Sequence, residues 1–229
     1  MVVNAPVSET NGHGHPWHLL CNEYGMTRTS LLTMAGAAMA VALAVPAAAQ
    51  DSAQRLLERG AYAEAVQHVE TERQAGNNDP ASTYLAGQAL LKLDRDQDAR
   101  TEFAKLSSGD NETWAAIGQS SIGLLDNNLD EAVGAARRAR DMNGDAGFTH
   151  YQLGLALIRQ NRFDEAAQVL DRAAELMPQF AYAHYHAGVA HQRAKRFNRM
   201  AEHFQVFLQL APDAPERRQV QLALNSLRG

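Results

Sequence analysis

The sequence has little cysteine, little proline and no excess of basic charge in its 229 residues. The single cysteine, Cys21, excludes an internal disulfide and a metal site built from cysteines. Seven prolines in an alanine-rich chain with few β-branched residues favour packed helices over sheet. A formal net charge of −5 gives no global basic field that could hold nucleic acid. With 45% hydrophobic residues, the chain can still bury a core of ordinary size.

The sequence also has no apolar run long enough to span a bilayer comfortably. Residues 31–45 are largely apolar, but this run is short of the roughly 20 residues that a spanning helix needs. Arg28 precedes the run and small residues follow it, which is typical of a cleavable signal peptide at 26–49. We therefore expect cleavage between Ala49 and Gln50, export to the periplasm and no stable membrane insertion afterwards. The exported part lacks cysteine, which suits an oxidising compartment.

Residues 1–25 precede the signal peptide and show no helical period. They would place a signal peptide inside the chain, so we hypothesise that translation begins at Met26. On this hypothesis residues 1–25 are a disordered extension from a misassigned gene start. Three histidines lie in this segment, His13, His15 and His18, and the same hypothesis argues against a metal site there.

A period of 34 residues runs through the exported part. Segments 147–180 and 181–214 align without a gap. The matched pairs are Gly154/Gly188, Phe163/Phe197, Ala166/Met200, Leu170/Phe204 and Pro178/Pro212. This period, with a small residue, an aromatic residue and a proline in that order, resembles the tetratricopeptide-repeat (TPR) family. The resemblance implies an all-α fold, a right-handed α-α superhelix in which each unit is a helix A, a turn and a helix B.

The pattern extends backwards through Ala132, Ala99 and Ala65, which stand at the position of Ala166. The predicted domain, 50–229, has units at 80–113, 114–146, 147–180 and 181–214. A degenerate unit at 50–79 precedes them, and a capping helix in 215–229 follows them, with Val220, Leu224 and Leu227 on one face.

Close packing explains the pattern. Glycine at 154 and 188 lets two helices cross closely, asparagines at 127, 128 and 161 fall at turns between helices A and B, and proline at 178 and 212 stops a helix B. The unit at 114–146 departs most from the pattern: Gln119 replaces an apolar residue, Ala136 a large one and Gly144 a proline.

The family resemblance also implies a concave groove. In TPR proteins, positions 2, 5, 9, 12 and 13 of each helix A point into this groove. At positions 2, 5 and 13 the sequence places aromatic or apolar residues and cations. The candidate partner-binding residues are Tyr84, Lys92, Trp114, Ile117, Phe148, Tyr151, Arg159, Tyr182, Tyr185 and Arg193. Aromatic residues are common binding hot spots, and arginine pairs well with carboxylates. The alternative is that these rings pack between repeats. Positions 9 and 12 carry no asparagine, which argues against a clamp for a partner's C-terminal carboxylate.

The histidines and acids predict no chemistry. His150 and His184 share position 4, which is normally packed, and the spacings among His184, His186 and His191 do not give an i, i+4 metal pair. His203, on the following helix, is expected to lie away from them. The acidic pairs 130–131 and 164–165 open helices, where they complement the helix dipole. We expect no enzyme activity, no cofactor and no metal.

The sequence thus favours a periplasmic adaptor or scaffold that binds a peptide or partner protein in its groove. One alternative is an accessory subunit or oligomerisation module of an envelope complex, with the groove filled by its own assembly. A weaker alternative is a module that binds haem or a metal through its histidines.

Overall fold

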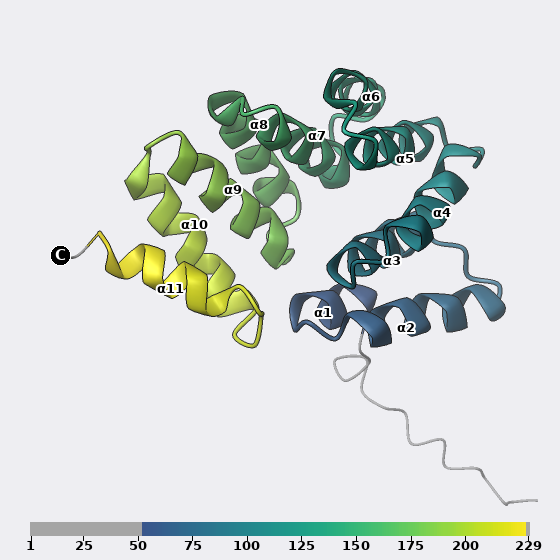
Figure 1. Ribbon diagram of the computed structural model, residues 1–229, viewed down its shortest axis with the longest axis horizontal. Helices are drawn as coiled ribbons and strands as arrows, with labels where there is room; N and C mark the ends of the chain where they lie inside the picture. The colour runs from purple at the N-terminus through teal and green to yellow at the C-terminus, as the bar shows by residue number, and fades with distance from the viewer. Residues whose placement is uncertain (1–51, 228–229) are drawn as a thin grey trace, which may run out of the picture. The chain divides into compact units, whose positions relative to one another are not determined.

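The computed structural model describes residues 52–227, which lie in one compact unit, 50–229. This part of the chain is helical throughout and has no strand (Figure 1). The helices are α1 (Ala53–Glu58), α2 (Tyr62–Gln74), α3 (Pro80–Lys92), α4 (Asp96–Ser107), α5 (Glu112–Leu125), α6 (Leu129–Met142), α7 (Gly147–Arg159), α8 (Phe163–Leu176), α9 (Ala181–Arg193), α10 (Phe197–Leu210) and α11 (Arg217–Asn225). The predicted all-α superhelix is confirmed. The predictions for residues 1–25 and 26–49 lie outside the described residues.

Helices α3 to α10 form four pairs, and each pair turns in the same way. One residue at each A–B turn adopts a left-handed conformation, namely Asp94, Asn127, Asn161 and Lys195. The next residue donates its backbone N–H to the carbonyl five residues earlier, as Arg162 does to Leu157 at 2.9 Å. This arrangement satisfies carbonyl groups that a helix end leaves unpaired. Asn127 and Asn161 occupy the expected turns, whereas Asn128 is not left-handed and precedes α6.

Small residues let the two helices of a pair approach closely. A Cβ atom added to Gly154 would lie 2.3 Å from Leu170 Cγ, and one added to Gly188 would lie 2.4 Å from Phe204. In the pair α5–α6 the side chains at this crossing differ in size. Ser120 stands in place of the glycine and Ala136 in place of the large residue, and both are fully buried. There the close approach moves to Gly123, whose added Cβ would lie 3.1 Å from the backbone N of Ala132.

The two ends of the superhelix meet. The N-terminus of α9 contacts α1, where the backbone N–H of Ala181 donates to Glu58 Oε1 at 2.8 Å. The turn after α1 contacts the segment before α11, where a Cβ on Gly60 would lie 2.7 Å from Pro215. Figure 1 shows α1 beside the loop that leads into α11. The helices therefore close into a ring around the inner face.

The last helix differs in part from its predicted form. Val220 is buried and Leu224 is half-buried against α10, but Leu227 lies beyond the end of α11 and is exposed. No helix between residues 52 and 227 combines the length and the apolar character needed to cross a membrane.

Candidate partner-binding site

The predicted groove residues at positions 2 and 5 come together, but most are not exposed. Tyr84, Ile117, Tyr151 and Tyr182 each expose 3% or less of their surface. Trp114, Phe148 and Tyr185 are half-buried. A side chain must be exposed to contact a partner, and these four side chains are buried. Their binding role stays a prediction without geometric support.

Buried and half-buried rings pack on one another as a continuous aromatic ladder. Its members are Tyr84, Trp114, Phe148, Tyr151, Phe180 and Tyr182. Neighbouring ring centroids are 5.1–6.4 Å apart, and most pairs are tilted or edge-to-face, which is favourable for aromatic rings. Leu56 and Leu57 of α1 are buried in the same core. The start of the degenerate first unit thus belongs to the same core as the aromatic ladder.

A chain of buried hydrogen bonds fixes the ladder in place. The Tyr84 hydroxyl donates to Gln152 Oε1 at 2.7 Å, and Gln152 Nε2 donates to Ser120 Oγ at 3.0 Å. All three side chains are fully buried. Burial raises the pKa of Tyr84, so its hydroxyl remains a neutral donor. This chain joins three successive helices A, and the sequence reasoning did not find Gln152.

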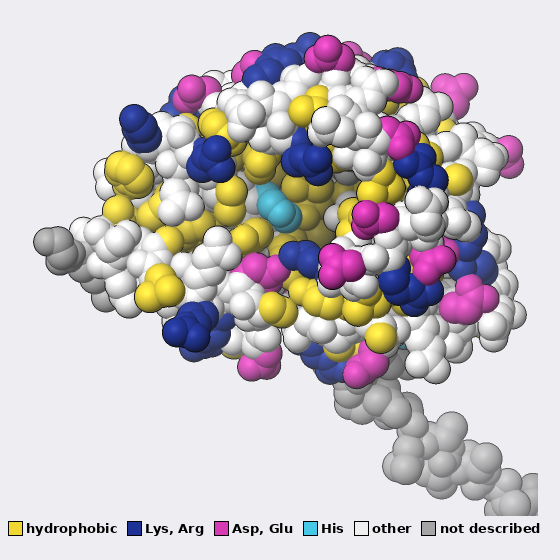
Figure 2. Space-filling model, viewed as in Figure 1, with side chains coloured by type: hydrophobic (Ala, Val, Ile, Leu, Met, Phe, Trp, Pro, Cys, Tyr) yellow, Lys and Arg dark blue, Asp and Glu magenta, His cyan; other side chains and the backbone are white. Residues whose placement is uncertain are grey.

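An open cavity of about 490 Å³ lies on the inner face. Its wall is formed by the later positions of three helices A, together with three residues from α4 and α9. The lining residues are Gln88, Leu91, Asp96, Phe103, Ser121, Leu124, Leu125, Leu155, Ile158, Arg159 and His186. Figure 2 shows a hollow with an apolar floor, one histidine inside it and basic side chains near its edge. The residues from α3, α5 and α7 stand at repeat positions 9, 12 and 13.

His186 places a polar group in this mainly apolar cavity. Its Nδ1 lies 2.9 Å from the carbonyl oxygen of Tyr182 and 3.0 Å from the Tyr151 hydroxyl. A carbonyl only accepts, so Nδ1 carries the proton and Nε2 is left as an acceptor. Burial lowers the pKa of His186 to about 4, against the opposing effect of its hydrogen bond to Tyr182. The imidazole is therefore neutral at pH 7.

The three predicted cations have different surroundings. Lys92 is paired with Glu216, with Nζ 2.6 Å from Oε1, and Arg193 lies over the Phe163 ring, 4.4 Å from its centroid. Arg159 lines the cavity, and its side chain has no ion pair or hydrogen bond within residues 52–227. Of the ten predicted residues, Arg159 alone lines this cavity. The cavity residues that the prediction missed could have been found from their positions in helix A, because positions 9 and 12 were expected to face the groove.

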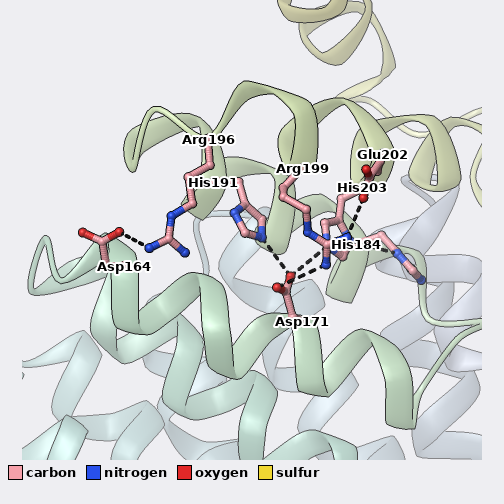
Figure 3. Close-up of polar contacts among 8 residues, drawn as sticks. All are labelled: Asp164, Asp171, His184, His191, Arg196, Arg199, Glu202 and His203. Carbon is pink, nitrogen blue, oxygen red and sulfur yellow. Dashed lines mark hydrogen bonds and ion pairs between the residues drawn. The ribbon is translucent and has the colours of Figure 1, made fainter.

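The histidines of the last repeat are closer together than expected. His203 was expected to lie away from the other histidines, which is wrong: its Nδ1 is 3.3 Å from His184 Nδ1. His203 and His191 also both contact Asp171, at 2.8 and 2.9 Å (Figure 3). Helices α9 and α10 are antiparallel neighbours in one repeat, so His191 and His203, which are twelve residues apart in sequence, lie on the same side of this helix pair.

Comparison with known proteins identifies the repeat. Residues 154–194 match the family model of the TPR repeat. A search of curated proteins gives no match. Among solved structures, the TPR domain of Arabidopsis OM64 is 17% identical over 50% of this chain and 95% of that chain, with a TM-score of 0.48.

Two further solved structures are similar at the same level. MamA from Desulfovibrio magneticus RS-1 is 26% identical over 69% of this chain and 90% of that chain, with a TM-score of 0.43. YrrB, titled as a TPR protein with an unusual peptide-binding site, is 20% identical over 77% and 89%, with a TM-score of 0.45. Because these TM-scores are low, the assignment rests on the matched repeat and on the helix pairs. The match at 154–194 thus identifies a tetratricopeptide repeat within the chain, and the successive helix pairs α3 to α10 give the rest of the described residues the same helix-turn-helix arrangement.

Proposed function

We propose that the chain is a protein-interaction scaffold whose inner cavity binds an apolar segment of a partner. The observation that carries this proposal is the composition of the cavity. Five aliphatic side chains line it, those of Leu91, Leu124, Leu125, Leu155 and Ile158, and it opens to solvent. Apolar surface gathered in an open hollow is typical of binding sites, because burying it against a partner is favourable.

The polar groups of the cavity indicate the chemistry of the segment. Arg159 has no ion-pair partner in the described part of the chain and can pair with a carboxylate. His186 Nε2 can accept a hydrogen bond from an N–H group. The segment that fits best carries a leucine-sized side chain with an acidic residue beside it.

Selection from a random peptide library on the full chain tests this proposal. We expect the selected peptides to share an apolar residue next to Asp or Glu. The substitution Arg159→Glu should weaken their binding at least tenfold in calorimetry, because it places a like charge beside the peptide's acid. Arg193→Glu is the matched control, since Arg193 ends helix α9 as Arg159 ends α7 but lies outside the cavity. The control should bind within about twofold of the parent.

Two results would count against this function. One is a set of peptides that binds the parent and Arg159→Glu equally well. The other is a defined oligomer in sedimentation whose assembly prevents peptide binding, as expected for an oligomerisation module.

We also propose that the scaffold acts in the periplasm. The signal-peptide pattern before Gln50 supports this location. Expression of the full chain with a C-terminal tag should give a periplasmic product that begins at Gln50. The variant Ala47→Leu/Ala49→Leu should remain uncleaved, because the small residues before the cleavage site are then lost. A cytoplasmic product that keeps residues 26–49 would contradict this location.

A further inference from the structure

A group of metal-ligating side chains lies between the last two repeats, outside the cavity. Asp171 comes from α8, His191 from α9 and His203 from α10 (Figure 3). The Nε2 atoms of His191 and His203 lie 2.9 and 2.8 Å from the same oxygen, Oδ1 of Asp171. One ligand atom from each residue lies within 4.8 Å of the others.

These three atoms fit one small divalent cation. Two imidazole nitrogens and a carboxylate oxygen are the donor set that zinc-class ions prefer, with bonds of roughly 2.0–2.2 Å. Such bonds hold the ligand atoms about 3.3 Å apart in a tetrahedral site, by simple geometry from the same bond lengths. The present spacing of 2.8–2.9 Å between each nitrogen and the carboxylate oxygen would have to grow by about 0.4–0.5 Å to reach this value. The two nitrogens lie within 4.8 Å of one another and would have to settle at the same spacing. The fourth position is left for water.

The surroundings orient two of the three ligands. His203 Nδ1 lies 3.3 Å from His184 Nδ1. When His203 carries its proton on Nδ1, it can donate to His184, and the lone pair of its own Nε2 then faces the cation. The second oxygen of Asp171, Oδ2, lies 3.3 Å from Arg199 Nη2. His191 is 2% exposed, and its Nδ1 has no hydrogen-bond partner among the described residues. A ligand without such a partner binds more weakly, so we expect moderate affinity.

We propose that Asp171, His191 and His203 bind one divalent transition-metal ion of the zinc class, and that this ion ties α8 to the pair α9–α10. The side chain of Asp171 is 24% exposed, which gives the ion a path from solvent. None of the three residues lines the inner cavity. The metal site is thus independent of partner binding, and its role is to stabilise the contact between two repeats.

Metal titration of the full chain tests this site. The variant His13→Gln/His15→Gln/His18→Gln/Cys21→Ser serves as background, because the N-terminal residues could bind metal themselves. With Co²⁺ we expect one equivalent and the visible absorption of a tetrahedral complex, and with Zn²⁺ a rise in melting temperature. Adding His191→Gln or His203→Gln to the background should lower the affinity for Co²⁺ at least tenfold. His150→Gln, a half-buried histidine outside the group, should leave it unchanged.

A surface variant keeps the test valid if the histidine variants fail to fold. Arg199 is half exposed and places a positive charge beside Asp171. Arg199→Gln should therefore raise the affinity for Co²⁺ and Zn²⁺ severalfold, whereas a network of hydrogen bonds without a metal role predicts no metal effect. Absence of binding to the background protein overturns the proposal, as does binding that His203→Gln and Arg199→Gln both leave unchanged.

Discussion

Single residues set how closely the helices of this array approach. Gly87 faces Phe103, Gly154 faces Leu170 and Gly188 faces Phe204, so a missing side chain on one helix makes room for a large one on the next. The 34-residue period predicts which glycines lie at crossings, because the period repeats the same local geometry. It does not predict the packing in the pair α5–α6, where a buried serine and a buried alanine replace the glycine and the large residue.

Two glycine-to-alanine substitutions separate packing from helix propensity. In Gly188→Ala the new Cβ would lie 2.4 Å from the buried Phe204 ring, so we expect a loss of about 1–3 kcal/mol in the free energy of unfolding. In Gly134→Ala the nearest atom is Arg138 Nη1 at 3.8 Å, so the helix gains about 0.5–1 kcal/mol. Urea unfolding of both variants measures the difference. Equal effects of the two substitutions would show that the crossing at Gly188 is not tight.

At the scale of the element, helix bounds followed from sequence better than helix surroundings did. Turn residues, helix-stopping prolines and the apolar period are local signals. Helices α3 to α10 form four successive pairs, as the four predicted units do, although α5 begins at Glu112, two residues before the unit at 114–146. The exposure of a helix A depends on what packs over it, which is a long-range property. Aromatic residues at positions 2 and 5 were expected either to line the groove or to pack between repeats, and Tyr84, Tyr151 and Tyr182 are buried. The cavity residues at positions 9 and 12 are a glutamine, a serine, three leucines and an isoleucine, which a search for aromatic residues overlooks.

The contact of α1 with α9 predicts a pH dependence of stability. Burial raises the pKa of Glu58 from 4.5 to about 7, against the hydrogen bonds from Ala181 and Gln54. Between these two values the folded chain keeps a proton that the unfolded chain releases. The contribution of Glu58 to the free energy of unfolding therefore falls as the pH rises from about 4.5 to 7 and is then constant, with a total loss of up to about 3 kcal/mol. His186, whose pKa is lowered from 6.5 to about 4, contributes in the opposite direction between these values, so the effect of Glu58 is measured as a difference between variants.

The variant Glu58→Gln isolates this effect. Glutamine does not titrate, and its Oε1 can still accept the hydrogen bonds from Ala181 and Gln54. We expect it to be more stable than the parent by about 1–3 kcal/mol at pH 8 and nearly equal to it near pH 4, measured by urea unfolding. Glu175→Gln, on an exposed side chain, is the control and should change stability little at either pH. A difference in stability between Glu58→Gln and the parent that does not grow between pH 4.5 and 7 would contradict the assigned burial of Glu58.

At the scale of the whole molecule, closure makes this array different from an open solenoid. In an open solenoid each repeat contacts only its neighbours, so the two ends are independent. Here Glu216, before α11, accepts a hydrogen bond from Lys92 of α3 at 2.6 Å and one from Tyr182 of α9 at 3.1 Å. Contacts between residues 124 apart leave no periodic signal in the sequence, which is why the closed ring was not predicted.

Closure predicts that a change near the C-terminus is felt at the N-terminus. Glu216→Ala removes both hydrogen bonds and should loosen the contact of the segment before α11 with the first helices. We expect amide hydrogens of α1 and α2 to exchange severalfold faster in hydrogen-exchange mass spectrometry, because local opening there becomes less costly. Leu222→Ala is the matched control, since Leu222 is 62% exposed on α11 and contributes little to the closure. In an open solenoid, Glu216→Ala would change exchange only in the last repeats, so unchanged exchange in α1 and α2 would show that the ends fluctuate independently.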